Sequence, residues 1–166
     1  MDFGLWDATF SFVCAIILVI FILFFVGVCF GAQYRHDGPA VLNDLKATPG
    51  AVRTTKLKDI CPHADTKAVR HVTESEKKQA CKEYGLKPAQ CMGTKVEFDH
   101  LISLELGGSN LILNLWPEPQ PQAREMKDKV EDWVHGQVCK GKIPLGEAQR
   151  WMAEDWYSEW HLMENK

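Results

Sequence analysis

The chain has 166 residues, of which 46% are hydrophobic and 25% are charged, and its formal net charge is −3 at pH 7. This length and composition fit one globular domain with a short additional segment, and the sequence contains no repeat or low-complexity tract. Residues 46–95 hold 11 Lys and Arg against 5 Asp and Glu, whereas residues 96–166 hold 7 against 13. Such parts could bind phosphate and cations respectively, but ordinary solvated helix faces explain the same charges.

Residues 1–32 form an apolar N-terminal segment. No charged residue lies between Ala8 and Ala32, and the stretch FSFVCAIILVIFILFFVGVCF is apolar almost throughout. About 20 such residues span a bilayer as a helix, whereas the apolar part of a signal peptide usually has about 7–15 residues. We therefore expect a transmembrane anchor with the membrane as its partner. A cleaved signal segment is the alternative, because the small residues after Cys29 offer a cleavage site.

Two features of the sequence disagree about the side of the membrane on which the soluble domain lies. Acidic residues precede the apolar segment and Arg35 and Lys46 follow it, so the positive-inside rule favours the cytoplasm. Four cysteines follow the segment without a C-x-x-C pair, which favours two disulfides over a zinc site; free buried cysteines are the alternative. Taking both together, we expect a periplasmic or extracellular domain, which would be secreted if the segment is cleaved.

The chain after this segment begins without a strong secondary-structure pattern. Residues 33–47 are predicted to be a linker with one possible helical turn, and residues 52–70 to be irregular or short-stranded. Thr73-Glu74-Ser75-Glu76 matches the capping box S/T-x-x-E, which begins a helix. We expect that helix to continue to about Tyr84 and to end at Gly85.

The second half of the chain has clearer elements. Alternating β-branched and aromatic residues predict a strand over 95–102, which ends before a turn at Gly107-Gly108. A long helix is predicted over 122–139, with Lys140-Gly141 as its stop, and a last helix from about 145 to 156 or beyond.

Asp99 and His100 are adjacent titratable residues inside the predicted strand. Consecutive residues of an extended strand point to opposite faces, so the two side chains cannot bind one metal together unless the backbone bends. This geometry suits a division of labour in which the carboxylate holds a divalent cation and the imidazole takes a proton from water. Histidine fits the second role because its ordinary pKa, about 6.5, lies near physiological pH. The structural alternative is a hydrogen-bonded histidine beside a turn-capping aspartate.

The stretch DHLISLELGGSNLILNLWPEP resembles the signature of the HNH endonucleases, which have the ββα-metal fold: an Asp-His pair, an apolar run, Gly-Gly-x-Asn and a second Asn. Fourteen positions separate His100 from Asn114, which is similar to the spacing in that family. Further segments from Thr48 to Trp156 resemble a secreted or envelope-targeted bacterial and phage branch. The resemblance implies an α+β fold with a ββα-metal core and flanking helices over residues 48–160, followed by a short tail over 161–166.

The resemblance implies a role for each matched residue. Asp99 would be a metal ligand and His100 the general base, while Asn114 would orient the base or steady the loop. Gly107 and Gly108 would shape the hairpin at positions where a side chain would clash or demand a negative φ.

The helix that follows departs from the family pattern. The His that usually completes the metal site is not evident; Asp128 and Glu131, three positions apart on one helix face, are the candidates, and His135 is a weaker one. Arg124 and Lys127 could neutralise substrate phosphate. Carboxylate ligands favour Mg²⁺ or Mn²⁺ over Zn²⁺ or Ni²⁺.

The implied activity is metal-dependent hydrolysis of phosphodiester bonds in nucleic acid, with DNA as the expected substrate and no small-molecule cofactor. A hypothesis for the cysteines, pairing Cys61 with Cys139 and Cys81 with Cys91, would tie the N-terminal part of the domain to the helix that carries the site. Two other functions stay open: a catalytically degenerate HNH module that binds nucleic acid or a protein without cleavage, and a membrane-tethered structural protein.

Overall fold

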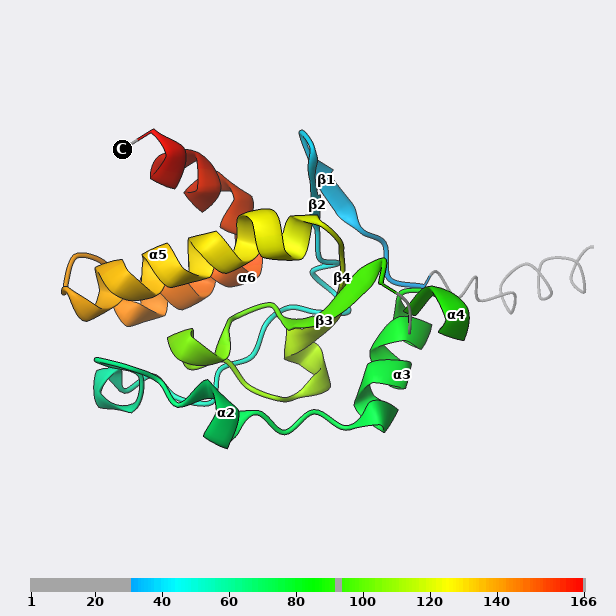
Figure 1. Ribbon diagram of the computed structural model, residues 1–166, viewed down its shortest axis with the longest axis horizontal. Coiled ribbons are helices and arrows are strands. Elements are labelled where there is room, and N and C mark those ends of the chain that lie inside the picture. The colour runs from blue at the N-terminus through cyan, green and yellow to red at the C-terminus, as the bar shows by residue number, and fades with distance from the viewer. Residues whose placement is uncertain (1–30, 92–93, 166) are drawn as a thin grey trace, which may run out of the picture. The chain divides into compact units, whose positions relative to one another are not determined.

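The computed structural model describes residues 31–91 and 94–165, which form an α+β domain with two small antiparallel sheets (Figure 1). The membrane segment is predicted over residues 1–32, and its first 30 residues lie outside the described part of the chain. Within the described part of the chain, no helix combines the length and the apolar character that crossing a bilayer requires. The compact unit begins at Gly31, which is earlier than the predicted domain start at residue 48.

The predicted linker over 33–47 is instead a packed hairpin of β1 (Arg35–Asp37) and β2 (Ala40–Leu42). Gly38 has φ 53 at the first central position of the turn, a conformation that favours glycine. Ala40 and Leu42 are buried in the core. The hairpin also exchanges hydrogen bonds with Gln122, whose amide bonds both backbone groups of Val41 at 2.6 and 2.7 Å. Local sequence did not predict it because these partners are distant along the chain.

Three short helices follow: α2 (Thr66–Val69), α3 (Glu74–Glu83) and α4 (Pro88–Cys91). α3 begins at the predicted capping box, in which Glu76 N–H donates to Thr73 Oγ1 at 3.2 Å and Thr73 N–H donates to Glu76 Oε2 at 2.7 Å. Gly85 follows the helix with φ 65. The predicted helix and both of its ends are therefore confirmed.

The second sheet pairs β3 (Val96–His100) with β4 (Leu115–Pro119) in antiparallel register, with His100 opposite Leu115. The predicted strand over 95–102 is thus present and slightly shorter. The connecting loop contains two short 3₁₀ turns and carries Gly107 and Gly108.

Both glycines of this loop are required by space. Gly107 has φ 82, and a Cβ there would lie 2.7 Å from the carbonyl oxygen of Thr54. A Cβ at Gly108 would lie 1.8 Å from the carbonyl oxygen of Ile102, which is shorter than any tolerated contact. This geometry fits the structural role that the resemblance implies for the glycine pair, and the loop folds back onto the end of β3.

The helix predicted over 122–139 consists of a π-helical turn (Ala123–Lys127) that continues into α5 (Asp128–Cys139). α6 (Leu145–Glu164) begins at the predicted residue, continues beyond Trp156 and includes most of the expected tail, although Asp155 at φ −163 and ψ 71 interrupts its helical geometry. α5 and α6 pack side by side (Figure 1). The core between the helices and the sheets contains Trp116 of β4 and Trp156 of α6, both 0% exposed.

Two disulfides join distant or neighbouring elements, and both have the hypothesised pairing. The long-range disulfide links Cys61 to Cys139 at the end of α5, and the short-range disulfide links Cys81 of α3 to Cys91 of α4. Their Cα–Cα distances of 5.6 and 6.0 Å are ordinary for disulfides. The long-range disulfide therefore fixes the segment before α2 against α5.

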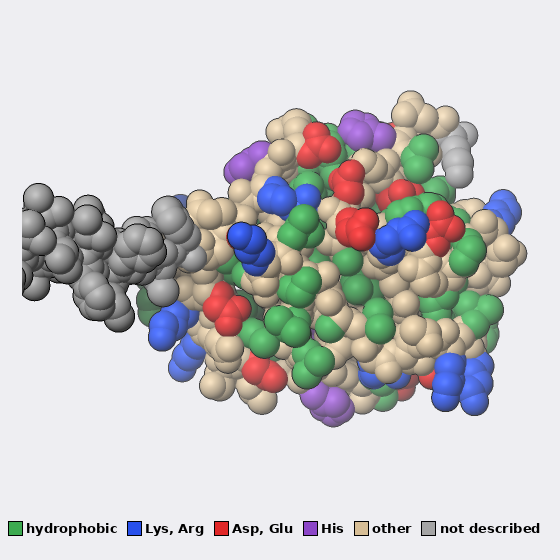
Figure 2. Space-filling model, turned by 180° about the vertical axis from the view of Figure 1, so that it is seen from behind, with side chains coloured by type: hydrophobic (Ala, Val, Ile, Leu, Met, Phe, Trp, Pro, Cys, Tyr) green, Lys and Arg blue, Asp and Glu red, His purple; other side chains and the backbone are tan. Residues whose placement is uncertain are grey.

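The unequal charge of the two sequence halves is not visible as a division of the face shown in Figure 2. On the face that Figure 2 shows, basic and acidic side chains are interspersed among apolar ones. The charge pattern of the sequence therefore does not by itself predict a phosphate-binding surface on this face.

Candidate active site

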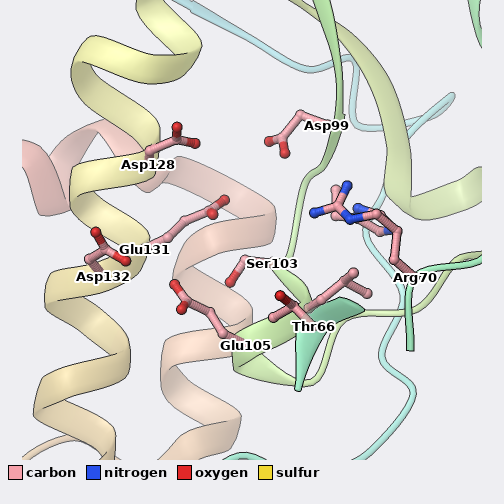
Figure 3. A pocket seen from close by; sticks show the side chains of 10 residues that line it. Thr66, Arg70, Asp99, Ser103, Glu105, Asp128, Glu131 and Asp132 are labelled. Atoms are coloured by element: carbon pink, nitrogen blue, oxygen red, sulfur yellow. The ribbon is translucent and has the colours of Figure 1, made fainter. Parts of the chain in front are cut away.

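A cavity of about 250 Å³ lies between the end of β3, the loop after it, α2 and α5. It gathers Asp99 and His100 from β3 with Asp128 and Glu131 from α5, four residues that the sequence predicts to form one site. In Figure 3 the carboxylate of Asp99 faces those of Asp128 and Glu131. The other residues that line the cavity are Thr66, Arg70, Ser103, Leu104, Glu105 and Asp132.

Asp99 and His100 both line this cavity although they are consecutive strand residues. His100 is the last residue of β3, and the chain bends at 101–102 immediately after it. The bend allows the two side chains to reach one cavity, which regular strand geometry would prevent.

The imidazole of His100 is oriented by Asn110, and this contact fixes its tautomer. Asn110 Nδ2 donates to the carbonyl oxygen of Val69 at 2.7 Å, and His71 N–H donates to Asn110 Oδ1 at 3.1 Å, so the amide has only one consistent orientation. Oδ1 then faces His100 Nε2 at 3.1 Å and can only accept, so Nε2 carries the proton.

The other ring nitrogen of His100 is the one able to accept a proton. The side chain is 2% exposed, and Nδ1 is buried without a hydrogen-bond partner among residues 31–91 and 94–165. Burial lowers the pKa of His100, and this effect outweighs the upward effects of the Asn110 hydrogen bond and the Asp99 charge. The imidazole is therefore neutral at physiological pH, with an unshared electron pair on Nδ1.

Asn114 has a different position from the one that a base-orienting residue needs. Its side chain is 0% exposed and makes four hydrogen bonds to backbone groups of Ala51, Ile102 and Ser109, at 2.9 to 3.3 Å. Of the two roles that the resemblance implies, this geometry fits steadying the loop. The contact between Asn110 and His100 was not predicted, because the signature itself does not say which of its two asparagines faces the histidine.

A fully buried lysine lies behind the carboxylates. Lys127 Nζ donates to Asp99 Oδ2, to Glu131 Oε1 and, at 3.0 Å, to the carbonyl oxygen of His100. Its side chain is 0% exposed and does not line the cavity. Glu118 is also fully buried and adds a third carboxyl group near Lys127.

Neither residue predicted to bind phosphate is placed to do so. Lys127 is enclosed by carboxylates, and Arg124 has an exposed side chain that pairs with Glu97 at 3.1 Å outside the cavity. Arg70 is the basic residue among those that line the cavity, and Figure 3 shows its guanidinium extending into it from the side opposite α5. No local motif marks Arg70, which directly follows α2.

Several acidic side chains that line the cavity have raised pKa values. Burial raises the pKa values of Glu105, Asp128 and Glu131, and the charge of Asp99 raises those of Asp128 and Glu131 further. Ser103, which is 5% exposed, also lines the cavity with a buried hydroxyl that has no partner in the described part of the chain. Carboxylate and hydroxyl oxygens are ligands that Mg²⁺ and Mn²⁺ prefer, so this donor set fits such an ion.

A second group of ligand-type residues lies away from the cavity. Among the described residues, only Cys61, His135 and Cys139 bring three His, Cys or carboxylate ligand atoms within 4.8 Å of one another. The disulfide occupies both sulfurs, and the thiolate is the form of cysteine that binds metal, so this group is not a metal site in the oxidised chain. His135 bonds the carbonyl oxygen of Ile60 at 3.0 Å and does not line the cavity.

No protein-family model, curated protein or solved structure matches this chain. The function of the cavity is therefore argued from its own residues.

Proposed function

We propose that the chain is a metal-dependent endonuclease of the HNH type, which hydrolyses phosphodiester bonds in nucleic acid, in particular DNA. The convergence of Asp99, His100, Arg70 and the carboxylates of α5 in one cavity carries this proposal. The order of elements supports it, because a β3–β4 hairpin followed by α5 is the order that a ββα-metal core would have.

His100 would act as the general base. Its Nδ1 would take a proton from a water molecule in the cavity while the water oxygen forms a bond to phosphorus. The bond from phosphorus to the 3′ oxygen would break, leaving a 5′-phosphate and a 3′ oxygen that gains a proton from solvent. Asn110 would hold the ring through Nε2–H during this step, so that Nδ1 faces the water.

The two walls of the cavity would bind the remaining parts of the reacting group. Asp99 would hold the divalent ion with Asp128 or Glu131, and the Arg70 guanidinium would bind the phosphate from the other side. When bound, Mg²⁺ or Mn²⁺ would stabilise the negative charge that develops on the phosphoryl oxygens. Among the described residues, these carboxylates do not bring three ligand atoms within 4.8 Å of one another, so Asp99 and one α5 carboxylate would hold the ion, and water would complete its coordination.

The two disulfides support a location for this activity outside the cytoplasm. Disulfides are rare in the reducing cytosol and persist in the periplasm and outside the cell. Residues 1–32 would then serve as the membrane anchor, or as a signal whose cleavage releases the domain.

Cleavage of supercoiled plasmid DNA by the full-length chain tests the proposal. We expect nicking with Mg²⁺ or Mn²⁺, its loss in excess EDTA, and a decrease of about 100-fold or more in His100→Ala, the range that general-base catalysis supplies. His63→Ala is the matched control, because His63 is exposed and does not line the cavity. Cleavage by His100→Ala at the rate of the control would exclude His100 as the base, and cleavage in EDTA would exclude the metal.

A further inference from the structure

The position of Lys127 has a consequence for the proposed cation site. One ammonium group bonds Asp99 from β3, Glu131 from α5 and the backbone carbonyl of His100. Each carboxylate gives one oxygen to the ammonium, Oδ2 of Asp99 and Oε1 of Glu131, and therefore keeps its other oxygen. Both carboxylates line the cavity while Lys127 does not.

The ammonium therefore lies on the far side of the carboxylates from the cavity. Its side chain is 0% exposed, against 17% for Asp99 and 12% for Glu131, so the carboxylates separate it from solvent. A cation that enters the cavity would reach Asp99 and Glu131 from the side opposite Lys127 and would not need to displace it.

Lys127 Nζ is buried among acceptors only. It donates to two carboxylates and to the carbonyl oxygen of His100, which is the arrangement of a charged ammonium group. A buried, charged and fully hydrogen-bonded ammonium has one geometry only, so it can fix the groups that it joins.

We propose that Lys127 is a positioning residue of the cation site: it holds Asp99 and Glu131 at a fixed separation and fixes the backbone at His100. This inference rests on the proposed function, because it concerns the ion that the same carboxylates would hold. Groups behind metal ligands orient them, and their removal typically weakens metal binding about 10- to 100-fold.

A purely electrostatic role for Lys127 predicts the opposite sign. If Lys127 contributed only a positive charge, its removal would increase the attraction between the carboxylates and a divalent cation, and binding would become tighter. Lys127→Met removes the charge and preserves most of the apolar stem. Glu118→Gln is the matched control, because Glu118 belongs to the same buried cluster but does not line the cavity.

The experiment measures Mn²⁺ binding by the full-length chain from the electron paramagnetic resonance signal of free Mn²⁺, with folding checked by near-ultraviolet circular dichroism. We expect Lys127→Met to bind Mn²⁺ at least about tenfold more weakly than wild type, and Glu118→Gln to bind it within about twofold of wild type. Unchanged or tighter binding by folded Lys127→Met would overturn the inference. Wild-type chain that binds Mn²⁺ and does not cut DNA would overturn the proposed function alone; wild-type chain that binds no Mn²⁺ would overturn both.

A measurement on the wild-type chain covers the case in which Lys127→Met does not fold. A buried, hydrogen-bonded ammonium exchanges its protons slowly and gives a ¹⁵N–¹H signal in nuclear magnetic resonance spectra. That signal should persist when Mg²⁺ saturates the site, because the ion binds on the other side of the carboxylates. Its loss would show that Mg²⁺ displaces the ammonium, which would overturn the inference.

Discussion

The two asparagines of the β3–β4 loop should have separable roles. Asn114→Ala removes four hydrogen bonds to buried backbone groups, each worth about 1 kcal/mol. We expect a loss of about 4 kcal/mol in the free energy of unfolding, which for a domain of this size lowers the melting temperature by roughly 10–20 °C. Below that temperature the loop still places His100, and cleavage should stay near the wild-type rate.

Asn110→Ala should reduce stability only slightly and cleavage strongly. Asn110 is half-buried, and the His71 N–H that it bonds is exposed and can bond water instead, so stability should decrease by only about 1–2 kcal/mol. The imidazole of His100, however, loses the acceptor that keeps the proton on Nε2. Cleavage should therefore decrease about 100-fold or more, as expected when a general base is no longer oriented.

Chemical unfolding in urea and plasmid cleavage well below the melting temperature give the two measurements for both variants. The variants are matched, because each removes the same amide group from the same loop. Wild-type cleavage by Asn110→Ala would refute the assignment of the tautomer. An Asn114→Ala chain with unchanged stability and no cleavage would show that Asn114, and not Asn110, orients the base.

Three further predictions concern residues around the site. Burial raises the pKa of Glu118 well above its ordinary value of 4.5, so the folded chain retains a proton that the unfolded chain releases. The free energy of unfolding should therefore decrease as the pH rises above about 4.5, and it should decrease less in Glu118→Gln. Urea unfolding at about pH 5 and pH 8 measures this difference. If this pH dependence were the same in the variant, Glu118 would not be its source. Replacing both cysteines of the long-range disulfide by serine should lower the free energy of unfolding by about 4–5 kcal/mol, and the same change in the short-range disulfide should lower it by about 3 kcal/mol. The difference arises because the two disulfides span 78 and 10 residues. Equal losses in denaturant unfolding would contradict this account. Arg70→Ala should raise the KM for DNA cleavage, whereas Arg124→Ala should leave it unchanged, since the Arg124–Glu97 pair is exposed and outside the cavity; the reverse result would return the phosphate contact to Arg124.

Sequence patterns predicted those parts of the fold whose causes are local. The capping box at Thr73 and Glu76 satisfies helix N–H groups within four residues, and the glycine pair is needed because the loop leaves no space for a Cβ. The β1–β2 hairpin was missed because its stability depends on burial of Ala40 and Leu42 and on Gln122, about 80 positions away.

The candidate site was predicted as a set of residues more completely than as a geometry. Asp99, His100, Asp128 and Glu131 line one cavity, which fits the set of residues that the resemblance implied. The partners of these residues could not be predicted. Which asparagine bonds His100, and which basic side chain lines the cavity, depend on how the loop and α2 pack. The sequence around Lys127 likewise did not indicate that this side chain would be buried.

The central claim is that Asp99 and a carboxylate of α5 hold one divalent ion beside His100. The most direct test is a crystal structure of the chain soaked in Mn²⁺, with the ion located by its anomalous scattering. The account predicts an anomalous peak in the cavity, coordinated by Asp99 and by Asp128 or Glu131, within reach of a water at His100 Nδ1. An empty cavity at saturating Mn²⁺, or a peak only at another site, would contradict it.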